Sequence, residues 1–513
     1  MTHKQIIGYA IAGIGILFVG LATALPTINQ FPAFIHAWAQ ADWYSLAIGF
    51  QNNGFDFFHP ETLIYNKQFP GRWRIDDFST ITSVDFPIHV YIISLLMKLF
   101  GTTDPWVFRT WTLLISIAGL WLLFLMCHRL TDNITKSLVV VGVALTSPLY
   151  AYYFNNFLPS APALAFVFSG LWAYVVYSQE RKRKYWYLAV FFLTLATLIR
   201  TSQAVPLIAV CCFEVFKLIF SKERTKFDKM QILPVVISIV VIGVFFKWNA
   251  HLRAENGSLF LNNLQPAQDW DDVHNVFEQI HKDWQYRYFS RPQYWLVAAT
   301  IIGAIAIVIK RRKKLSAQSL VWLAAVYMFG TILFFVAMFN QYHDHDYYFL
   351  DSFFAPILLA FALAIKQLPE LKNWRKYAII PLLLILGNVM FNAAYHNNRD
   401  RSNPNDRALQ CSINYEGSDK WLDSIGISRN AKILTLLAYP QNTPFIKMKR
   451  KGYTEMFFSQ DIVDHVIQFN YDYIIIEDNI GDKLKKIDYK PERLERITGN
   501  GKLSIFKLRH EEH

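Results

Sequence analysis

Charged residues are scarce in this 513-residue chain. They make up 18% of the sequence, whereas soluble domains typically carry about a quarter. Hydrophobic residues make up 53%, and they gather in blocks close to the length that spans a bilayer of about 30 Å. The composition therefore argues against a soluble globular protein and predicts an all-α polytopic membrane protein.

Cysteine and phosphate-binding motifs are equally sparse. Three of the four cysteines, Cys127, Cys211 and Cys212, lie in apolar blocks and Cys411 lies near the tail, so no disulfide framework is expected. The sequence contains no internal repeat and no glycine-rich phosphate loop, which argues against a nucleotide-binding role. The net charge of +12 does not indicate nucleic-acid binding, because the basic residues form short clusters between apolar blocks, as in loops that face anionic lipid.

Twelve apolar blocks are present, and about eleven are predicted to span the membrane. They cover residues 5–25, 86–100, 107–127, 137–154, 160–178, 185–200, 203–220, 231–248, 294–310, 318–339, 347–366 and 376–395. The block 86–100 is short for a span, so we expect an interfacial or re-entrant helix there. Ala22-Thr23-Ala24 resembles a signal cleavage site, but the near-spanning length of the first block favours a retained anchor.

The basic clusters predict the orientation. Residues 181–184, 222–226, 311–314 and 372–376 are separated by even numbers of spans, so all four fall on one side, the cytoplasm. The N-terminus joins them if 86–100 does not cross. The long, aromatic and acidic links then lie outside, and any chemistry is expected on that face of a cell (inner or plasma) membrane.

Two domains are expected. Residues 1–395 form the transmembrane domain, with outer loops 27–106 and 249–293, and residues 396–513 form a small soluble extracytoplasmic α/β domain. In this tail, 431–438, 472–477 and 502–508 read as strands and 461–469 as a helix.

The first outer loop carries the most unusual polar residues. His36 and Gln40 share a helical face with Trp43, and Asp42 lies next to Trp38. Asp85 precedes the short block, and a folded loop would bring it towards Asp42. Aromatic residues interleaved with acids suit a sugar or headgroup site; an aromatic membrane belt and an N-cap role for Asp85 are the alternatives.

Charged residues recur at the outer ends of spans. Arg109 and Arg200 are suited to bind a phosphate, because the guanidinium fork matches phosphate oxygens, although snorkelling to headgroups is an alternative. The run from Gln341 to Tyr348 alternates His and Asp. It could hold a divalent metal, but adjacent alternation directs only two of these side chains to one face, so no metal or other cofactor is expected. Asp346 is a candidate helix cap.

Several segments together resemble glycosyltransferase family 39, which includes protein O-mannosyltransferases and the lipid A aminoarabinose transferase. They are His36-x-Trp-x-Gln-x-Asp42, Gly54-Phe-Asp-Phe-Phe-His-Pro60, Asp85-Phe-Pro87, Leu96-x-Lys-Leu-Phe-Gly101, Asn156-x-Leu-Pro159, the Arg200 site and His345-Asp-Tyr-Tyr348. The resemblance covers residues 1–395 and implies a GT-C fold with interfacial first-loop helices.

The resemblance also implies roles for individual residues. Asp42 matches the acid that takes the proton of the acceptor, and Asp85 matches the acid that shapes the site. Arg200 matches a basic position that meets the phosphate of the donor, a polyprenyl-phosphate sugar. The remaining expected donor- or substrate-binding residues are His36, Gln40, His59, Arg109, Asn156, His345, Tyr347 and Tyr348.

The family therefore implies an inverting membrane glycosyltransferase that uses a lipid-linked sugar donor and a protein, glycan or lipid acceptor. Two departures bear on activity: Trp43 follows Asp42 where the family often has Glu, and Ser160 replaces a second-loop acid. The alternatives are a transporter or flippase of lipid-linked sugars, which the outer-face position of the polar residues disfavours, and a non-catalytic envelope assembly protein.

Overall fold

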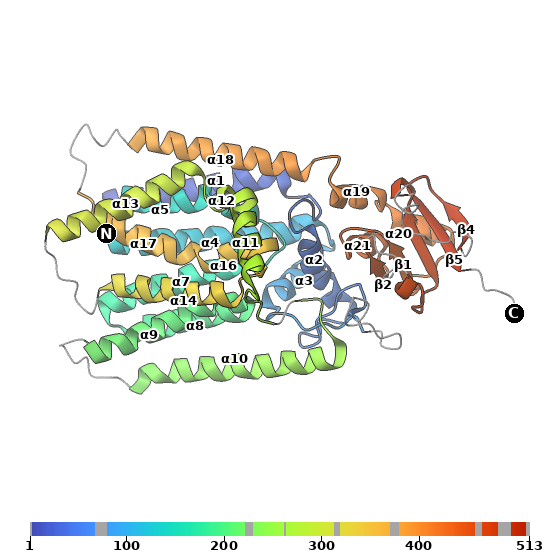
Figure 1. The fold of residues 1–513 in the computed structure, drawn as a ribbon, viewed down its shortest axis with the longest axis horizontal. Helices are drawn as coiled ribbons and strands as arrows, with labels where there is room; N and C mark the ends of the chain where they lie inside the picture. The colour runs from blue at the N-terminus through green and yellow to red at the C-terminus, as the bar shows by residue number, and fades with distance from the viewer. Residues whose placement is uncertain are drawn as a thin grey trace. The chain divides into compact units, whose positions relative to one another are not determined.

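The computed structural model describes residues 3–66, 79–220, 229–260, 263–311, 319–369, 379–456, 464–480 and 494–508 (Figure 1). Every one of the twelve apolar blocks contains helix in its described residues. The corresponding helices are α1 (His3–Ala24), α3 (Ile88–Phe100), α4 (Pro105–Thr131), α5 (Ile134–Thr146), α6 (Pro148–Tyr153), α7 (Ser160–Glu180), α8 (Arg183–Ile199), α9 (Ala204–Phe220), α10 (Lys229–Asn256), α13 (Arg291–Lys310), α14 (Leu320–Ala337), α16 (Tyr347–Ser352), α17 (Phe354–Gln367) and α18 (Ile379–Arg401).

Seven helices in the described ranges are long and apolar enough to cross a membrane, and α3, α5 and α17 are shorter apolar helices. The block 137–154 is divided into α5 and α6 by Ser147. This residue is extended (ψ 126°), because the ring of Pro148 disfavours the helical conformation in the residue before it. Ser147 then caps α6 by accepting a hydrogen bond from the Tyr150 amide.

The chain forms two compact units. The first comprises Met1–Ile28, Arg109–Phe245 and Asn262–Asn397, and the second comprises Asn29–Phe108, Phe246–Leu261 and Asn398–His513. The tail thus shares a unit with the first outer loop. The segment 249–293, predicted as a loop, contains the end of α10 and the helices α11 (Trp270–Gln279) and α12 (Gln285–Tyr288), joined by a π-helical turn, Ile280–Trp284.

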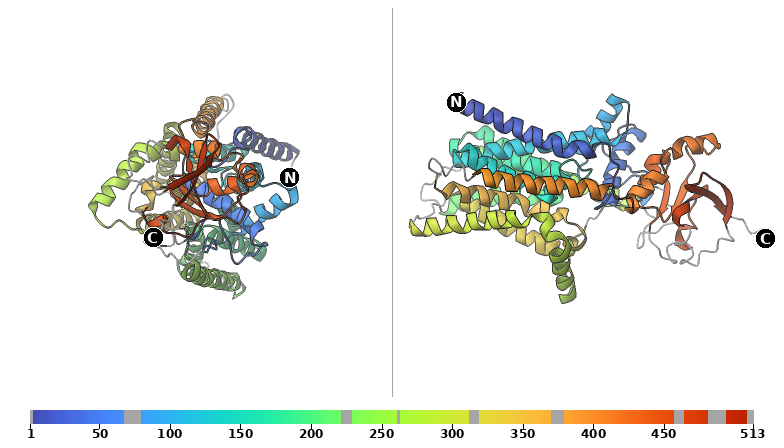
Figure 2. Two further views of the ribbon diagram at one scale, coloured as in Figure 1. Left: turned by 90° about the vertical axis from the view of Figure 1, so that its right-hand side faces the viewer. Right: turned by 90° about the horizontal axis from the view of Figure 1, so that it is seen from above.

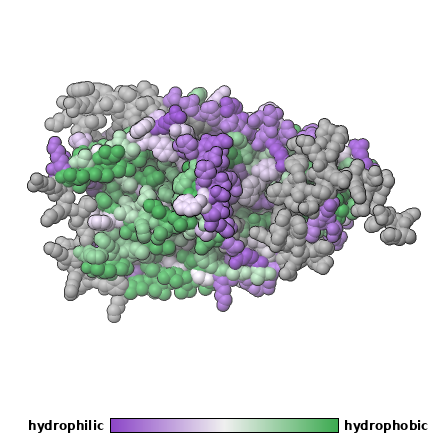
Figure 3. Space-filling model, viewed as in Figure 1, coloured by the Kyte–Doolittle hydropathy of each residue, from purple (hydrophilic) through white to green (hydrophobic). Residues whose placement is uncertain are grey.

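In the first unit, long helices lie side by side, with α7 against α8, α9 against α14 and α13 against α17 (Figures 1 and 2). Most of α7 is buried, whereas α13 exposes Trp295, Ile302, Ile305 and Ile309. Figure 3 shows hydrophobic side chains covering much of this face of the unit. An apolar surface on long helices is expected where a protein contacts lipid.

The second unit contains α2 (Ala37–Asn52), α3 and the described part of the tail. The tail contributes a five-stranded sheet and the helices α19 (Arg407–Asn414), α20 (Ser418–Ser424) and α21 (Thr443–Met448). The strands are β1 (Ile433–Leu436), β2 (Gly452–Glu455), β3 (Tyr473–Glu477), β4 (Leu494–Gly499) and β5 (Leu503–Leu508). Their order is β2-β1-β3-β5-β4, with β1 parallel to β2 and β3, and β5 antiparallel to β3 and β4.

The strands predicted at 431–438, 472–477 and 502–508 are confirmed as β1, β3 and β5, whereas β2 and β4 were not predicted. The predicted helix 461–469 lies partly outside the described residues. Alternating Leu434 and Leu436 of β1 pack with Ile474 and Ile476 of β3 in the buried core of the sheet. The prediction of β1 and β3 as buried strands from their apolar runs is therefore consistent with their burial, since all four residues of β1 and the last four of β3 are buried.

The first outer loop extends this sheet. The Gly452 amide donates to the Leu63 carbonyl (3.2 Å) and the Tyr65 amide donates to the Gly452 carbonyl (3.1 Å), so the segment lies along the outer edge of β2. Tyr65 also packs against Tyr453. The backbone of Ile433 is so close to Gly452 that any side chain there would collide with it. The loop and the tail thus share one core.

Candidate functional site

Asp42 lies on α2 and is fully buried, with 0% of its surface exposed. Two side-chain amides of the tail enclose its carboxylate. Gln441 Nε2 donates to Oδ1 (3.0 Å) and to Oδ2 (2.9 Å), and Asn442 Nδ2 donates to Oδ1 (2.8 Å). Burial raises the pKa of Asp42 from 3.8 to about 7, against the opposing effect of these hydrogen bonds. The carboxyl group can therefore gain and lose a proton near neutral pH.

The two amides come from the loop between β1 and α21, and Asn442 is the N-cap residue of α21. This loop follows the carboxyl end of β1, which is parallel to both neighbouring strands. Loops in this position commonly carry binding residues. The sequence analysis did not identify Gln441 or Asn442, although a polar pair that begins three residues after the predicted buried strand 431–438 was a signal that could have found them.

His36 and Gln40 organise the start of α2. His36 is the residue before the helix and has a left-handed backbone conformation (φ 51°). The Gln40 side chain donates to the carbonyls of Ala33 (3.2 Å) and Ile35 (2.6 Å). These contacts hold the turn that leads into α2, the helix of Asp42. His36 and Gln40 were predicted to bind substrate; these contacts are with the backbone around the start of α2.

The other two predicted residues of the loop lie elsewhere in the second unit. His59 Nδ1 is 2.8 Å from Asp56 Oδ2, and both side chains are exposed. Asp85 is not the N-cap residue of α3, because Pro87 occupies that position and the helix begins at Ile88. The interpretation of Asp85 as the N-cap, with Pro87 in the first helical turn, is therefore wrong, since the helix begins two residues later than that interpretation requires.

Arg200 and the aromatic pair Tyr347 and Tyr348 come together in the first unit. The guanidinium lies 5.3 Å from the Tyr347 ring centre and 6.0 Å from that of Tyr348. Its Nε (3.0 Å) and Nη2 (2.6 Å) donate to Oδ2 of the buried Asp351, which also accepts from Ser202 (3.1 Å). The structure thus supplies a carboxylate partner that the sequence analysis missed, although an acid inside an apolar block is a sign of function.

A second arginine–aspartate pair lies in the same unit. Arg287 of α12 is 3.4 Å from Oδ2 of the buried Asp346, and the Tyr153 hydroxyl donates to Asp346 Oδ1 (2.6 Å). Asp346 precedes α16 as expected, but its side chain makes no cap hydrogen bond. The cap interpretation is wrong because the carboxylate is engaged by groups on other helices. Arg287 was not identified from the sequence.

Arg109 is fully buried in the first unit. Its Nη1 donates to the Asn155 carbonyl (3.0 Å), and its guanidinium lies 4.4 Å from the Phe157 ring centre. Asn156, between these two residues, accepts a hydrogen bond at its side-chain oxygen from the Phe157 amide (2.6 Å). The snorkelling interpretation of Arg109 is therefore wrong, because the side chain points into protein rather than to headgroups.

The His-Asp run shows no arrangement typical of a metal site. His345 Nδ1 is 3.2 Å from the Gln341 carbonyl, and its ring packs edge-on against Tyr347 and Tyr348. His343 pairs with its exposed neighbour Asp344 (2.6 Å). Within the described ranges, no three His, Cys, Asp or Glu side chains are grouped to hold a metal ion.

Residues 85–248 match the family model described as dolichyl-phosphate-mannose-protein mannosyltransferase, and no curated protein sequence matches the chain. Among solved structures, ArnT from Cupriavidus metallidurans bound to undecaprenyl phosphate is similar, with a TM-score of 0.59 and 10% sequence identity, over 99% of this chain and 98% of that chain.

The oligosaccharyltransferase of Archaeoglobus fulgidus, tethered with an acceptor peptide, is also similar, with a TM-score of 0.51 and 12% identity, over 94% of this chain and 70% of that chain. The same enzyme in complex with an inhibitory peptide and a dolichol-phosphate gives a TM-score of 0.50 at 11% identity over the same shares. The matched segment confirms the resemblance to family 39, and the solved structures confirm the expected fold. Together with the long apolar helices, they support a multi-pass membrane protein.

Proposed function

We propose that this protein, whose fold is that of the GT-C membrane glycosyltransferases, transfers a sugar from a polyprenyl-phosphate donor to an acceptor hydroxyl, with Asp42 as the general base. The observation that carries the proposal is the enclosed Asp42 carboxylate, whose pKa is raised by burial to about 7. A general base is most effective when its pKa lies near the working pH.

The hydrogen bonds of Asp42 leave a lone-pair position of the carboxylate available to accept a proton. A carboxylate offers about four lone-pair positions. Gln441 and Asn442 occupy two on Oδ1, and Gln441 occupies one on Oδ2. Oδ2 therefore retains the capacity to accept the acceptor proton. Because Asp42 is fully buried, groups that cover it have to move before an acceptor can reach it.

Arg200 is the proposed contact for the donor phosphate. Asp351 fixes the guanidinium through Nε and Nη2 and itself accepts a hydrogen bond from Ser202. This arrangement orients the guanidinium before a substrate arrives, and preorganised charge of this kind stabilises a leaving group. Arg109, in contrast, is buried against a backbone carbonyl and Phe157. We assign it the task of holding the turn around Asn156 rather than direct contact with phosphate.

In the proposed reaction, the acceptor oxygen attacks the anomeric carbon and the bond between that carbon and the phosphate oxygen breaks. The hydroxyl proton passes to Asp42, and the polyprenyl phosphate leaves with the electron pair of the broken bond. A single displacement inverts the anomeric configuration. General-base assistance of this kind typically contributes about 10²–10⁴-fold.

The relatives support the type of donor. The ArnT structure holds undecaprenyl phosphate, and one structure of the A. fulgidus enzyme is a complex with a dolichol-phosphate. With the basic clusters in the cytoplasm, the first outer loop and the tail lie on the extracytoplasmic face. We propose that this protein uses such a donor on that face, with a protein, glycan or lipid acceptor.

The test is transfer of radiolabel from polyprenyl-phosphate sugars in membranes that carry wild-type protein, Asp42→Asn or Asp104→Asn. Asp104 is a matched control, because it is an exposed acid of the same loop. Label is expected to leave the donor with wild type and Asp104→Asn only. Transfer by folded Asp42→Asn would refute the assignment, and donor that stays intact with wild type would favour a transporter or assembly role.

A further inference from the structure

A large cavity lies in the second unit, between the first outer loop and the tail. It has a volume of about 560 Å³ and is lined by the C-terminal end of α2, by α21 and by the tail residues that follow α21. Gln51 and Asn52 line it from α2, and Ile446 and Lys449 line it from α21 and its C-terminal end. Gln51 follows Asp42 by nine residues on the same helix, a rise of about 14 Å. The helix that carries Asp42, α2, and the helix capped by Asn442, α21, thus both contribute residues to the wall of this cavity.

The cavity wall is basic. Arg429, Lys449, Arg450 and Lys451 line it, and no acid does among the described residues. Three of these cations are more exposed than their acidic partners: the side chain of Arg429 is 61% exposed against 35% for Asp423, that of Lys449 is 57% exposed against 15% for Asp419, and that of Lys451 is 37% exposed against 8% for Glu61. Arg450, in contrast, is fully buried and pairs with the more exposed Asp423. Arg429, Lys449 and Lys451 therefore present positive charge outwards, and a ligand with negative groups gains charge-assisted hydrogen bonds there.

One polar group in the wall has no partner. Among the described residues, Gln51 Nε2 is buried without a hydrogen bond. A buried donor without an acceptor costs free energy, so its retention points to an oxygen supplied by a ligand. Asn52 and Asn430 add further amides to the same wall. Amides beside cations are suited to a ligand that carries both hydroxyl and anionic groups.

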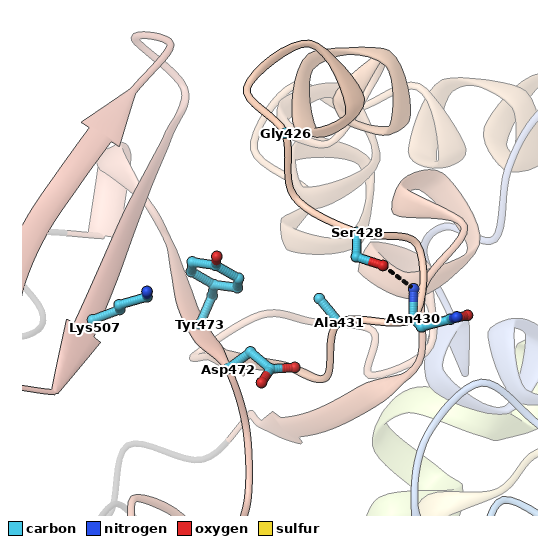
Figure 4. Close-up of a pocket in the computed structure, with 7 residues that line it drawn as sticks. All are labelled: Gly426, Ser428, Asn430, Ala431, Asp472, Tyr473 and Lys507. Carbon is cyan, nitrogen blue, oxygen red and sulfur yellow. Dashed lines mark hydrogen bonds between the residues drawn. The ribbon is translucent and has the colours of Figure 1, made fainter.

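A smaller cavity of about 410 Å³ continues the surface, and Asn430 lines both cavities. Figure 4 shows Tyr473 and Lys507 on one side and the loop 426–431 on the other. Lys507 Nζ lies 4.9 Å from the Tyr473 ring centre. Asp472 also lines this cavity and accepts from the Lys432 amide (2.8 Å), so anionic groups of a ligand are expected on the Lys507 side.

The same surface is poorly suited to an extended peptide. An acceptor peptide commonly binds by adding a strand to an open sheet edge. The edge of β2 beside the larger cavity already pairs with Leu63–Tyr65 through Gly452. The remaining features are amides, cations and the half-buried ring of Tyr473. Amides can bind the hydroxyl groups of a sugar, cations its acidic groups, and an aromatic ring its apolar face.

We propose that these two cavities bind an anionic oligosaccharide and that this glycan is the acceptor, a step that rests on the proposed transferase function. The end of the glycan that receives the sugar would lie towards Asp42 along α2. The acidic part of the chain would extend past Asn430 towards Lys507.

The test is calorimetric titration of full-length protein in lipid nanodiscs with hexagalacturonate, which has a carboxylate on every sugar. Maltohexaose is the neutral control and hexaglutamate is the peptide control. Hexagalacturonate is expected to bind most tightly of the three, and its affinity is expected to fall as salt is added. Equal binding of maltohexaose, tighter binding of hexaglutamate, or no binding of hexagalacturonate would overturn the proposal.

Variants then locate the site. Arg429→Gln and Lys507→Gln, one in each cavity, are each expected to weaken binding about tenfold, because each removes a charge-assisted hydrogen bond. Lys502→Gln is the matched control, an exposed lysine of the same tail that lines neither cavity. Gln51→Met is expected to weaken binding without lowering the melting temperature. Binding unchanged in all three cavity variants would overturn the site.

Binding and transfer are measured separately, so the two proposals fail in different ways. Hexagalacturonate binding in a protein that transfers no label from any donor would overturn the acceptor role and the transferase function. Transfer by a protein that binds no anionic glycan would overturn the cavity proposal alone.

Discussion

The replacement of Asp42 by Asn is expected to abolish transfer and to stabilise the folded protein at alkaline pH. The reason is the pKa of Asp42, which burial raises from 3.8 to about 7 in the folded state. In the unfolded chain the group loses its proton at its ordinary pKa. Between these two values the folded state binds more protons, so stability falls as pH rises.

The size of the effect follows from the two pKa values. Each pH unit of difference corresponds to about 1.4 kcal/mol, so the ionised carboxylate destabilises the fold by about 4 kcal/mol above pH 7. The penalty is absent below the ordinary pKa. The amide group that replaces the carboxyl group in the Asp42→Asn variant carries no charge at any pH. The amide oxygens of Gln441 and Asn442, which are buried without partners in the described part of the chain, can accept from the new NH₂ group after an amide rotation.

The assay is the melting temperature of wild type, Asp42→Asn and Asp104→Asn in nanodiscs from pH 5 to pH 8. The melting temperature of Asp42→Asn is expected to rise relative to wild type as pH increases, while that of the exposed control stays parallel to wild type. A melting temperature for Asp42→Asn that falls below wild type at pH 8 would refute the reasoning, because it would mean that the ionised carboxylate stabilises the fold.

Three further predictions concern the same residues. The transfer rate should rise about tenfold per pH unit below pH 7 and level off above it, because the base must be ionised; a flat profile would count against Asp42 as the base. Gln441→Ala should move that midpoint to higher pH, since the lost hydrogen bond favoured the carboxylate, and a midpoint that moves down would contradict this. Asp351→Ala should lower stability by about 3–5 kcal/mol, because it leaves the largely buried Arg200 without its carboxylate; denaturation at the wild-type midpoint would show that the pair contributes nothing.

The apolar helices were predictable because their signal is local. Seven of the described helices are long and apolar enough to cross a membrane, against about eleven predicted spans. An apolar run of about twenty residues needs only its own length to indicate a helix in a bilayer. The division of 137–154 into two helices also had a local signal, the proline that follows Ser147, but the sequence analysis considered only the hydrophobicity of this block. β2 and β4 were missed because each is a short run that mixes polar residues with apolar ones and becomes a strand only through its neighbours.

The candidate site was less predictable because its contacts join distant segments. Asp42 was identified from a resemblance in the first loop, but its partner Gln441 is 399 residues away. Neither residue type nor spacing reveals such a pair in one sequence. Asp351 differs, since an acid inside the apolar block 347–366 was a visible anomaly that was overshadowed by the neighbouring Tyr347 and Tyr348.

The pairing of the first loop with the tail has a consequence for biosynthesis. At about 5–20 residues per second, the ribosome needs about 20–80 s to make the 399 residues that separate Asp42 from Gln441. Throughout that time the loop has already emerged, while Tyr65 lacks the sheet against which it packs and Asp42 lacks both amides. The enclosure of the carboxylate is therefore among the last events in the maturation of the protein, and a chain whose synthesis stops before the tail has no enclosed Asp42.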